Sequence, residues 1–238
     1  MENQEPTPST ETIEPTENTP QIPLIWRIVA VVVALIIVIA LLYPRLQSTE
    51  NSSTTGVSRN GDITTNTGNA SVQDLFKQGQ AHYQNGAWDQ AIAAYQQALA
   101  LDPQHQSSYV NLGDAYYQKG NLEAAIDNYQ HALDLSPDDA EVAYNLGAAY
   151  LQQALAAGNG SPDPAKLDQA IAQIEQAIQL NIELPHPYYA LGAAYQILGQ
   201  NEQAIQNFEK FLELDDGSDA MATSTAQQIL DQLKEEVP

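Results

Sequence analysis

Apolar residues recur along residues 106–139 with the spacing of two amphipathic helices. The first predicted helix covers about residues 107–118 and the second about residues 122–135. Residues 119–121, with a central glycine, separate the two helices, and Pro137 follows the second because proline cannot continue a helix. The pattern therefore predicts a helical hairpin.

The same residue types return at intervals of 34 residues, which indicates that the hairpin is repeated. Glycine recurs at the eighth position of each unit and alanine at the twentieth, so the paired helices can approach closely. These residues are Gly79, Gly113, Gly147 and Gly192, and Ala91, Ala125, Ala170 and Ala204. The predicted units are 72–105, 106–139, 140–184 with an 11-residue insertion, and 185–218. In the insertion, Ala and Leu residues are expected to lengthen the first helix of the unit by about a turn.

This repeat resembles the tetratricopeptide repeat family, whose unit carries Leu-Gly and Tyr on its first helix and Ala, an aromatic residue and Pro on its second. The resemblance implies an all-α fold, in which four helix-turn-helix repeats stack into an α-solenoid over residues 71–238. A further helix, 219–236, is expected to cap the last hairpin, with Met221, Ile229 and Leu233 facing inward.

Three segments of distinct composition precede the repeats. Residues 1–23 contain five Glu, no Lys or Arg, and many Pro and Thr, which predicts a disordered acidic tail. Residues 24–43 are almost wholly apolar, and as a helix they would be about 30 Å long, enough to span a bilayer. We therefore expect one transmembrane helix, with a cleaved signal peptide as the alternative. Residues 44–70, rich in Ser, Thr and Asn, predict a flexible linker.

The charges beside residues 24–43 do not decide the orientation of a single-pass protein in the cell membrane. Arg27 lies at one end, whereas Arg45 and Arg59 follow the other end. The linker is similar to the stalks of membrane-anchored bacterial repeat proteins that face outward. This similarity favours an extracytoplasmic repeat domain.

The chain has 30 acidic and 8 basic residues and a net charge of −22. Long-range repulsion opposes binding to nucleic acid or anionic headgroups, so we expect neutral or basic partners. Cysteine is absent, and the four histidines have no metal-ligand spacing. No phosphate-binding loop, dinucleotide fingerprint or nucleophile motif is present in the sequence. We therefore expect no catalysis, cofactor or metal.

The family resemblance also implies a concave groove lined by the first helices of successive units. The corresponding residues here are Phe76, Gln80, Tyr83, Val110, Asn111, Asp114, Tyr117, Tyr144, Asn145, Leu151, Tyr189 and Gln196. Asn111 and Asn145 occupy equivalent positions, where they are expected to form a ladder that hydrogen-bonds an extended peptide backbone. The tyrosines are expected to add contact area. Alternatively, these tyrosines pack against neighbouring helices.

Together these features predict a membrane-anchored scaffold that binds a neutral or basic peptide and recruits it to the membrane. The family also contains members that grip a terminal carboxylate with Lys and Arg, but one such place here holds Glu141, which would repel that ligand. The second hypothesis is self-association of the repeats into membrane-tethered oligomers.

Overall fold

The computed structural model describes residues 70–156 and 161–236, and the regular structure in these ranges is entirely α-helical. In chain order the helices are α2 (Val72–Gln84), α3 (Trp88–Leu101), α4 (Gln106–Gln118), α5 (Leu122–Leu135), α6 (Ala140–Leu155), α7 (Pro164–Leu180), α8 (Pro185–Ile197), α9 (Asn201–Leu214) and α10 (Ala220–Glu236). The predicted all-α fold is therefore confirmed for this part of the chain. None of the described helices is both long and apolar enough to cross a bilayer. The predicted tail, transmembrane helix and linker lie outside the described residues, apart from Ala70 at the end of the linker.

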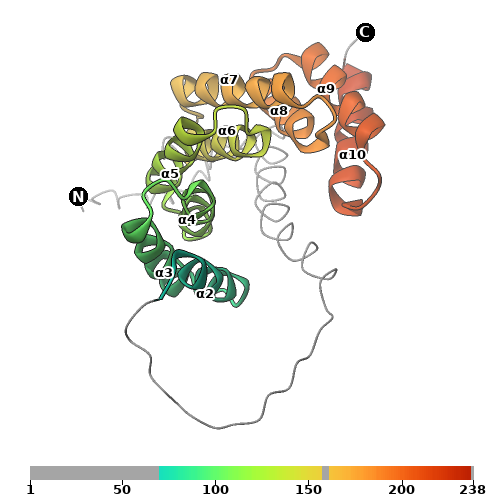
Figure 1. Cartoon of the computed structure of the whole chain (residues 1–238). Coiled ribbons are helices and arrows are strands. Elements are labelled where there is room, and N and C mark those ends of the chain that lie inside the picture. The colour runs from blue at the N-terminus through green and yellow to red at the C-terminus, as the bar shows by residue number, and fades with distance from the viewer. Residues whose placement is uncertain (1–69, 157–160, 237–238) are drawn as a thin grey trace, which may run out of the picture.

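The helices form four antiparallel hairpins, α2–α3, α4–α5, α6–α7 and α8–α9, and each hairpin packs against the next. Together they follow an arc, with α2, α4, α6 and α8 on its inner side (Figure 1). Contacts between first helices of adjacent hairpins, α2 with α4 and α6 with α8, accompany this curvature. The predicted solenoid is confirmed, and its first helices share one concave side.

Close packing within each hairpin depends on the predicted small residues. A Cβ atom added to Gly79 or Gly113 would lie 2.4 or 2.7 Å from a ring carbon of Tyr95 or Tyr129. One added to Gly147 would lie 2.6 Å from Ile174 Cγ1. The alanines at the twentieth position of the units are all fully buried. The second helix of each hairpin therefore packs directly on the backbone of the first.

The third hairpin has the longest first helix of the four. Helix α6 contains 16 residues, whereas α2, α4 and α8 contain 13 each, so the predicted extension by about a turn is confirmed. The chain returns through Asp163, whose backbone N–H donates to the carbonyl of Ala154 at 2.8 Å. The Asp163 carboxylate then caps α7 by accepting from the backbone N–H groups of Ala165 and Lys166.

Helix α10 covers the last hairpin by packing against α9. Its buried residues include Ala222, Ala226, Ile229 and Leu233, which follow the spacing of one helical face. Ile229 and Leu233 thus face inward as expected. The expectation for Met221 was wrong: its side chain is 48% exposed, because this residue lies one position before the buried stripe.

Candidate functional site

All twelve residues of the predicted groove lie on the first helices of the hairpins, α2, α4, α6 and α8. They divide into two sets according to burial. The partly exposed set is Gln80, Tyr83, Val110, Asn111, Asp114, Tyr144, Asn145 and Gln196, and the buried set is Phe76, Tyr117, Leu151 and Tyr189. We call the partly exposed set the inner-face residues.

The four buried residues belong to the packed core and are not open to a ligand. Leu151 is 1% exposed and Tyr189 is 4% exposed. The Tyr189 ring lies edge-on to Phe208 and Phe211, with centroids 5.6 and 5.2 Å away. Phe76 similarly packs against Tyr95. For Tyr117 and Tyr189, the alternative that these aromatic rings pack against neighbouring helices is therefore confirmed.

Asp114 occupies the centre of a group of tyrosines at the junction of the first two hairpins. Its Oδ1 accepts a hydrogen bond of 2.7 Å from the Tyr129 hydroxyl on α5. Tyr83 on α2 and Tyr95 on α3 lie close enough for the Asp114 charge to affect their ionisation. Among the described residues, Asp114 has no cationic partner, and its Oδ2 accepts no hydrogen bond. Asp114 is therefore a partly exposed residue on a first helix, and one of its carboxylate oxygens accepts no hydrogen bond from the described residues.

Burial controls the ionisation of this group. It raises the pKa of Asp114 to about 6, although the hydrogen bond from Tyr129 lowers this pKa in part. Burial also raises the pKa of Tyr117 to about 12. The pKa values of Tyr83, Tyr95 and Tyr129 are also raised, first by burial and then by the neighbouring Asp114 charge. At neutral pH the tyrosines are therefore neutral donors, while Asp114 is mostly ionised.

The two asparagines of the predicted ladder differ in how they are held. The Asn111 Nδ2 donates to the Ser107 carbonyl at 2.8 Å, and its Oδ1 accepts from the Tyr95 hydroxyl at 3.4 Å. Asn145, at the equivalent position of α6, makes no hydrogen bond within the described residues. Asn111 is thus fixed in place with one amide hydrogen available, whereas Asn145 has all its amide groups available.

The sequence analysis did not foresee that second helices hold the polar residues of the first helices. The buried Tyr95 and Tyr129 lie on α3 and α5, and their hydroxyls donate to Asn111 and Asp114 on α4. The sequence did contain a signal for these bonds. The first two units have Tyr where the fourth unit has Phe208, and a buried tyrosine hydroxyl needs a polar neighbour.

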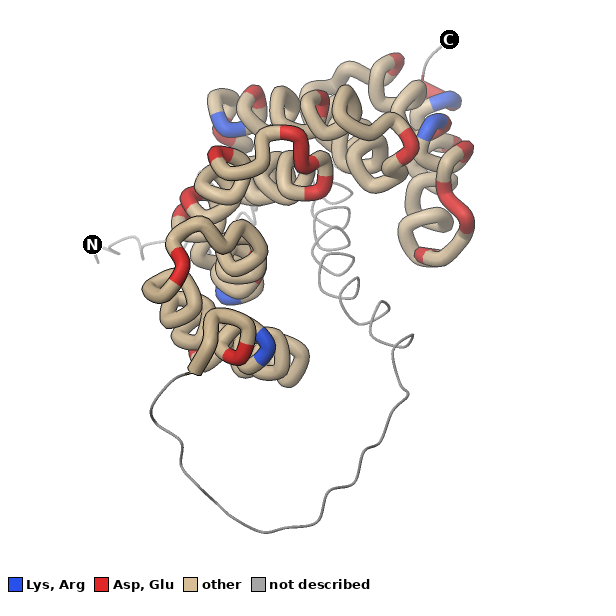
Figure 2. Tube along the Cα trace, in the orientation of Figure 1, with Lys and Arg blue, Asp and Glu red and all other residues tan. Residues whose placement is uncertain are grey.

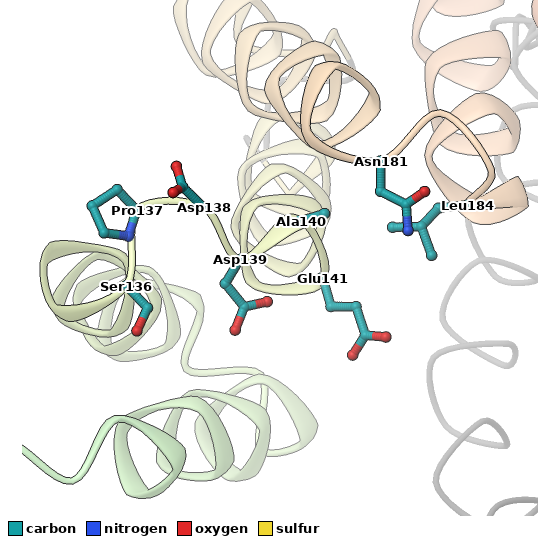
Figure 3. Close-up of a pocket in the computed structure, with 8 residues that line it drawn as sticks. All are labelled: Ser136, Pro137, Asp138, Asp139, Ala140, Glu141, Asn181 and Leu184. Carbon is teal, nitrogen blue, oxygen red and sulfur yellow. The ribbon is translucent and has the colours of Figure 1, made fainter.

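An open depression of about 610 Å³ lies on another part of the molecule, between the α5–α6 and α7–α8 connections. It is lined by Ser136, Pro137, Asp138, Asp139, Ala140, Glu141, Asn181 and Leu184 (Figure 3). The Asp139 carboxylate caps α6 and also accepts from Gln106 Nε2 at 2.8 Å. The carboxylates of Asp138 and Asp139 point in different directions (Figure 3). Within residues 70–156 and 161–236, no three metal-ligating side chains come together.

Acidic residues far outnumber basic ones along the described solenoid (Figure 2). The ion pairs among the described residues join Lys119 to Asp89, Lys210 to Glu213 at 2.9 Å, and Lys234 to Glu209 at 2.7 Å. All three involve partly or largely exposed side chains, so each contributes little to stability. The field around the repeats consequently remains strongly negative.

Two family profiles match the chain. One, described as TPR repeat, matches residues 79–120 and again 113–153. The other, described as tetratricopeptide repeat, matches residues 185–217. Both describe a repeat rather than a catalytic domain. A search of curated proteins found no match.

Solved structures with a similar fold include two crystal structures of MamA. The first is 25% identical with a TM-score of 0.55, and the similarity covers 69% of this chain and 86% of MamA. The second is also 25% identical with a TM-score of 0.52, and the similarity covers 66% of this chain and 93% of that one. The similarity therefore extends over about two thirds of this chain and over most of each MamA chain.

Proposed function

The chain belongs to the tetratricopeptide repeat family, and from this premise we propose that it is a membrane-tethered scaffold for a neutral or basic segment of another protein. The observation that carries this proposal is the row of partly exposed polar and aromatic side chains on consecutive first helices. Such side chains supply hydrogen bonds and amphipathic contact area to an extended segment. The net charge of −22 adds long-range attraction for a basic partner.

Binding on the inner side can be tested with an asparagine double variant. The pair Asn111→Ala and Asn145→Ala removes the two equivalent amides, and we expect captured partners to be lost from pull-downs with the full chain. A matched control is Asn128→Ala with Asn207→Ala, on the second helices α5 and α9. Both control side chains donate to the carbonyl four residues earlier, as Asn111 does. If the variant with Asn111→Ala and Asn145→Ala still captures the same partners as the wild-type chain, binding on the inner side is rejected.

The membrane part of the proposal depends on residues 24–43, which lie outside the described residues. Fractionation of cells that express the full chain tests the tether, since deletion of residues 24–43 should release the protein from the membrane pellet. Protease treatment of intact cells then tests the extracytoplasmic placement. We expect the repeats to be digested, and protection of the repeats would reverse the proposed orientation.

Self-association is a second candidate function, favoured by a row of exposed leucines. Leu101, Leu135 and Leu180 end the second helices of three successive hairpins and are 58%, 38% and 36% exposed. Copies of so acidic a chain repel one another, so association should strengthen as salt screens the charges. Light scattering of the full chain in neutral detergent at low and high salt tests this candidate. A monomer at both salt concentrations would reject it.

A further inference from the structure

We propose that Asp114 is the anchor for a cationic side chain, lysine or arginine, of the segment that binds the inner side of the solenoid. This inference rests on the proposed function, and it specifies the chemistry of one position in the partner. The contacts of Asp114, the partly exposed Tyr83 near it and the alanines at equivalent positions of later hairpins support this assignment.

Asp114 is a carboxylate that has no counter-charge in the described part of the chain. Oδ1 is occupied by the Tyr129 hydroxyl, while Oδ2 has no hydrogen-bond donor from the described part of the chain. The lysines that form ion pairs are engaged with Asp89, Glu213 and Glu209. A half-buried anion of this kind is unfavourable unless a cation or further donors complete its shell.

One partly exposed aromatic ring lies near Asp114. Tyr83 on α2 is partly exposed and close enough for the Asp114 charge to affect its ionisation, whereas the rings of Tyr95 and Tyr129 are buried. An accessible aromatic ring near a carboxylate suits the aliphatic stem and charged end of lysine or arginine, because the ring face attracts cations. A carboxylate-bearing or phosphorylated side chain would instead be repelled.

The positions equivalent to Asp114 in the later hairpins carry no charge. The residues that correspond to Asp114 in the third and fourth hairpins are Ala148 and Ala193, and both are buried without a charge. The repeat itself therefore packs well without a carboxylate at this position. A structural role for the Tyr129 hydrogen bond would be served equally by a neutral acceptor such as asparagine.

The proposal can be tested with two small cations and a neutral analogue. The probes are Nα-acetyl-arginine amide, Nα-acetyl-lysine amide and Nα-acetyl-citrulline amide, which has the shape of the arginine probe without its charge. They would be titrated into the full chain, labelled with ¹³C at aspartate carboxyl groups, in neutral detergent at pH 8. We expect saturable shifts of the Asp114 signal with both cations, and an affinity about tenfold lower for citrulline. The relative affinities of the two cations show which side chain the site prefers.

Two further measurements separate an anchor from a structural carboxylate. In the wild-type chain, a saturating cation should lower the pKa of Asp114, and by reciprocity its affinity should fall about tenfold between pH 8 and pH 5. Asp114→Asn should weaken both cations about tenfold, whereas Asp127→Asn, the same change on the exposed side of α5, should not. The wild-type pKa measurement remains decisive if Asp114→Asn fails to fold.

Equal binding of arginine and citrulline probes, an Asp114 pKa that the cations leave unchanged, or full binding by Asp114→Asn would each overturn the proposal. The proposed function fails in a different way. If pull-downs lose their partners with the Asn111 and Asn145 variant but keep them with Asp114→Asn, only the anchor is rejected. If the asparagine variant also keeps its partners, binding on the inner side is rejected as well.

Discussion

The Tyr129 hydroxyl donates a 2.7 Å hydrogen bond to Asp114 Oδ1 and thereby joins the two helices of the second hairpin. The ring of the same tyrosine lies against Gly113, where an added Cβ would be only 2.7 Å from its Cε1. One residue thus fills the seam between α4 and α5 and also binds Asp114. Changes at Gly113 or Tyr129 should affect the packing of this seam, and changes at Asp114 should affect the charge beside it.

Replacement of Asp114 by asparagine should stabilise the protein at pH 7 to 8. Burial raises the folded-state pKa of Asp114 to about 6, above the value of an unfolded aspartate, so the ionised form costs stability once the pH exceeds that range. Asparagine retains an acceptor for Tyr129 without the charge. We expect a gain of about 3 kcal/mol at pH 8.

This gain should shrink as the pH falls through 6 and should vanish near pH 4, where the folded wild-type protein carries a protonated Asp114. Urea unfolding of both proteins across this pH range measures the difference. The comparison cancels the effects of the other carboxylates, which are the same in both proteins. A difference that is independent of pH would contradict the assigned pKa.

Two tyrosine-to-phenylalanine changes should have opposite effects. The buried Tyr129 hydroxyl has a carboxylate acceptor, so Tyr129→Phe should cost about 1–3 kcal/mol. The buried Tyr189 hydroxyl has no hydrogen-bond partner among the described residues, so Tyr189→Phe should be neutral or stabilising by about 1 kcal/mol. Thermal unfolding of both variants checks the contrast. Equal losses of stability would show that Tyr189 has a partner.

Replacement of two equivalent glycines by alanine should show how closely the paired helices pack in the second and fourth hairpins. Gly113→Ala places a Cβ 2.7 Å from the Tyr129 ring and should cost about 2 kcal/mol after the gain in helix propensity. At Gly192 the same change places the Cβ 3.1 Å from Phe208, so the smaller strain should be largely offset by that gain. Chemical unfolding ranks the two variants. A larger loss at Gly192 would be inconsistent with the observed packing.

The first described helix should depend on its N-terminal cap. Ser71 accepts from the backbone N–H of Asp74 at 3.1 Å, while the Asp74 carboxylate accepts from the Ser71 backbone at 3.2 Å. Ser71→Ala removes the first bond and should cost about 1 kcal/mol of stability. Hydrogen exchange should show the loss mainly in α2, whereas Ser224→Ala, an exposed serine within α10, should change little. Equal effects of the two changes would argue against the cap.

The hairpins could be predicted from the sequence because each depends on local rules. Glycine and alanine at fixed positions set the distance between paired helices, and Pro137 ends a helix whatever its surroundings. The capping box of Ser71 and Asp74 depends on an equally local rule. The position of Met221 was missed because a one-residue shift turns a side chain about 100° around a helix, from the seam to solvent.

The character of the inner side was harder to predict because it depends on contacts between units. The sequence placed Tyr117 and Tyr189 on first helices at positions that suggested an open groove, but the rings turn into the core. The group around Asp114 needs residues from four helices, and no spacing within one helix specifies it. A signal was nevertheless present: units with Tyr95 or Tyr129 carry Gln80 or Asp114 at the ninth position, whereas the later units carry alanine there.

Extensive helix contacts run almost entirely between neighbours along the chain, from α2 to α10. One consequence concerns how such a protein changes through evolution. Gene duplication or loss of one whole unit would leave the remaining seams intact, so the reach of the scaffold can grow or shrink without redesign of its core. The third unit shows that longer helices, α6 and α7, also fit between their neighbours.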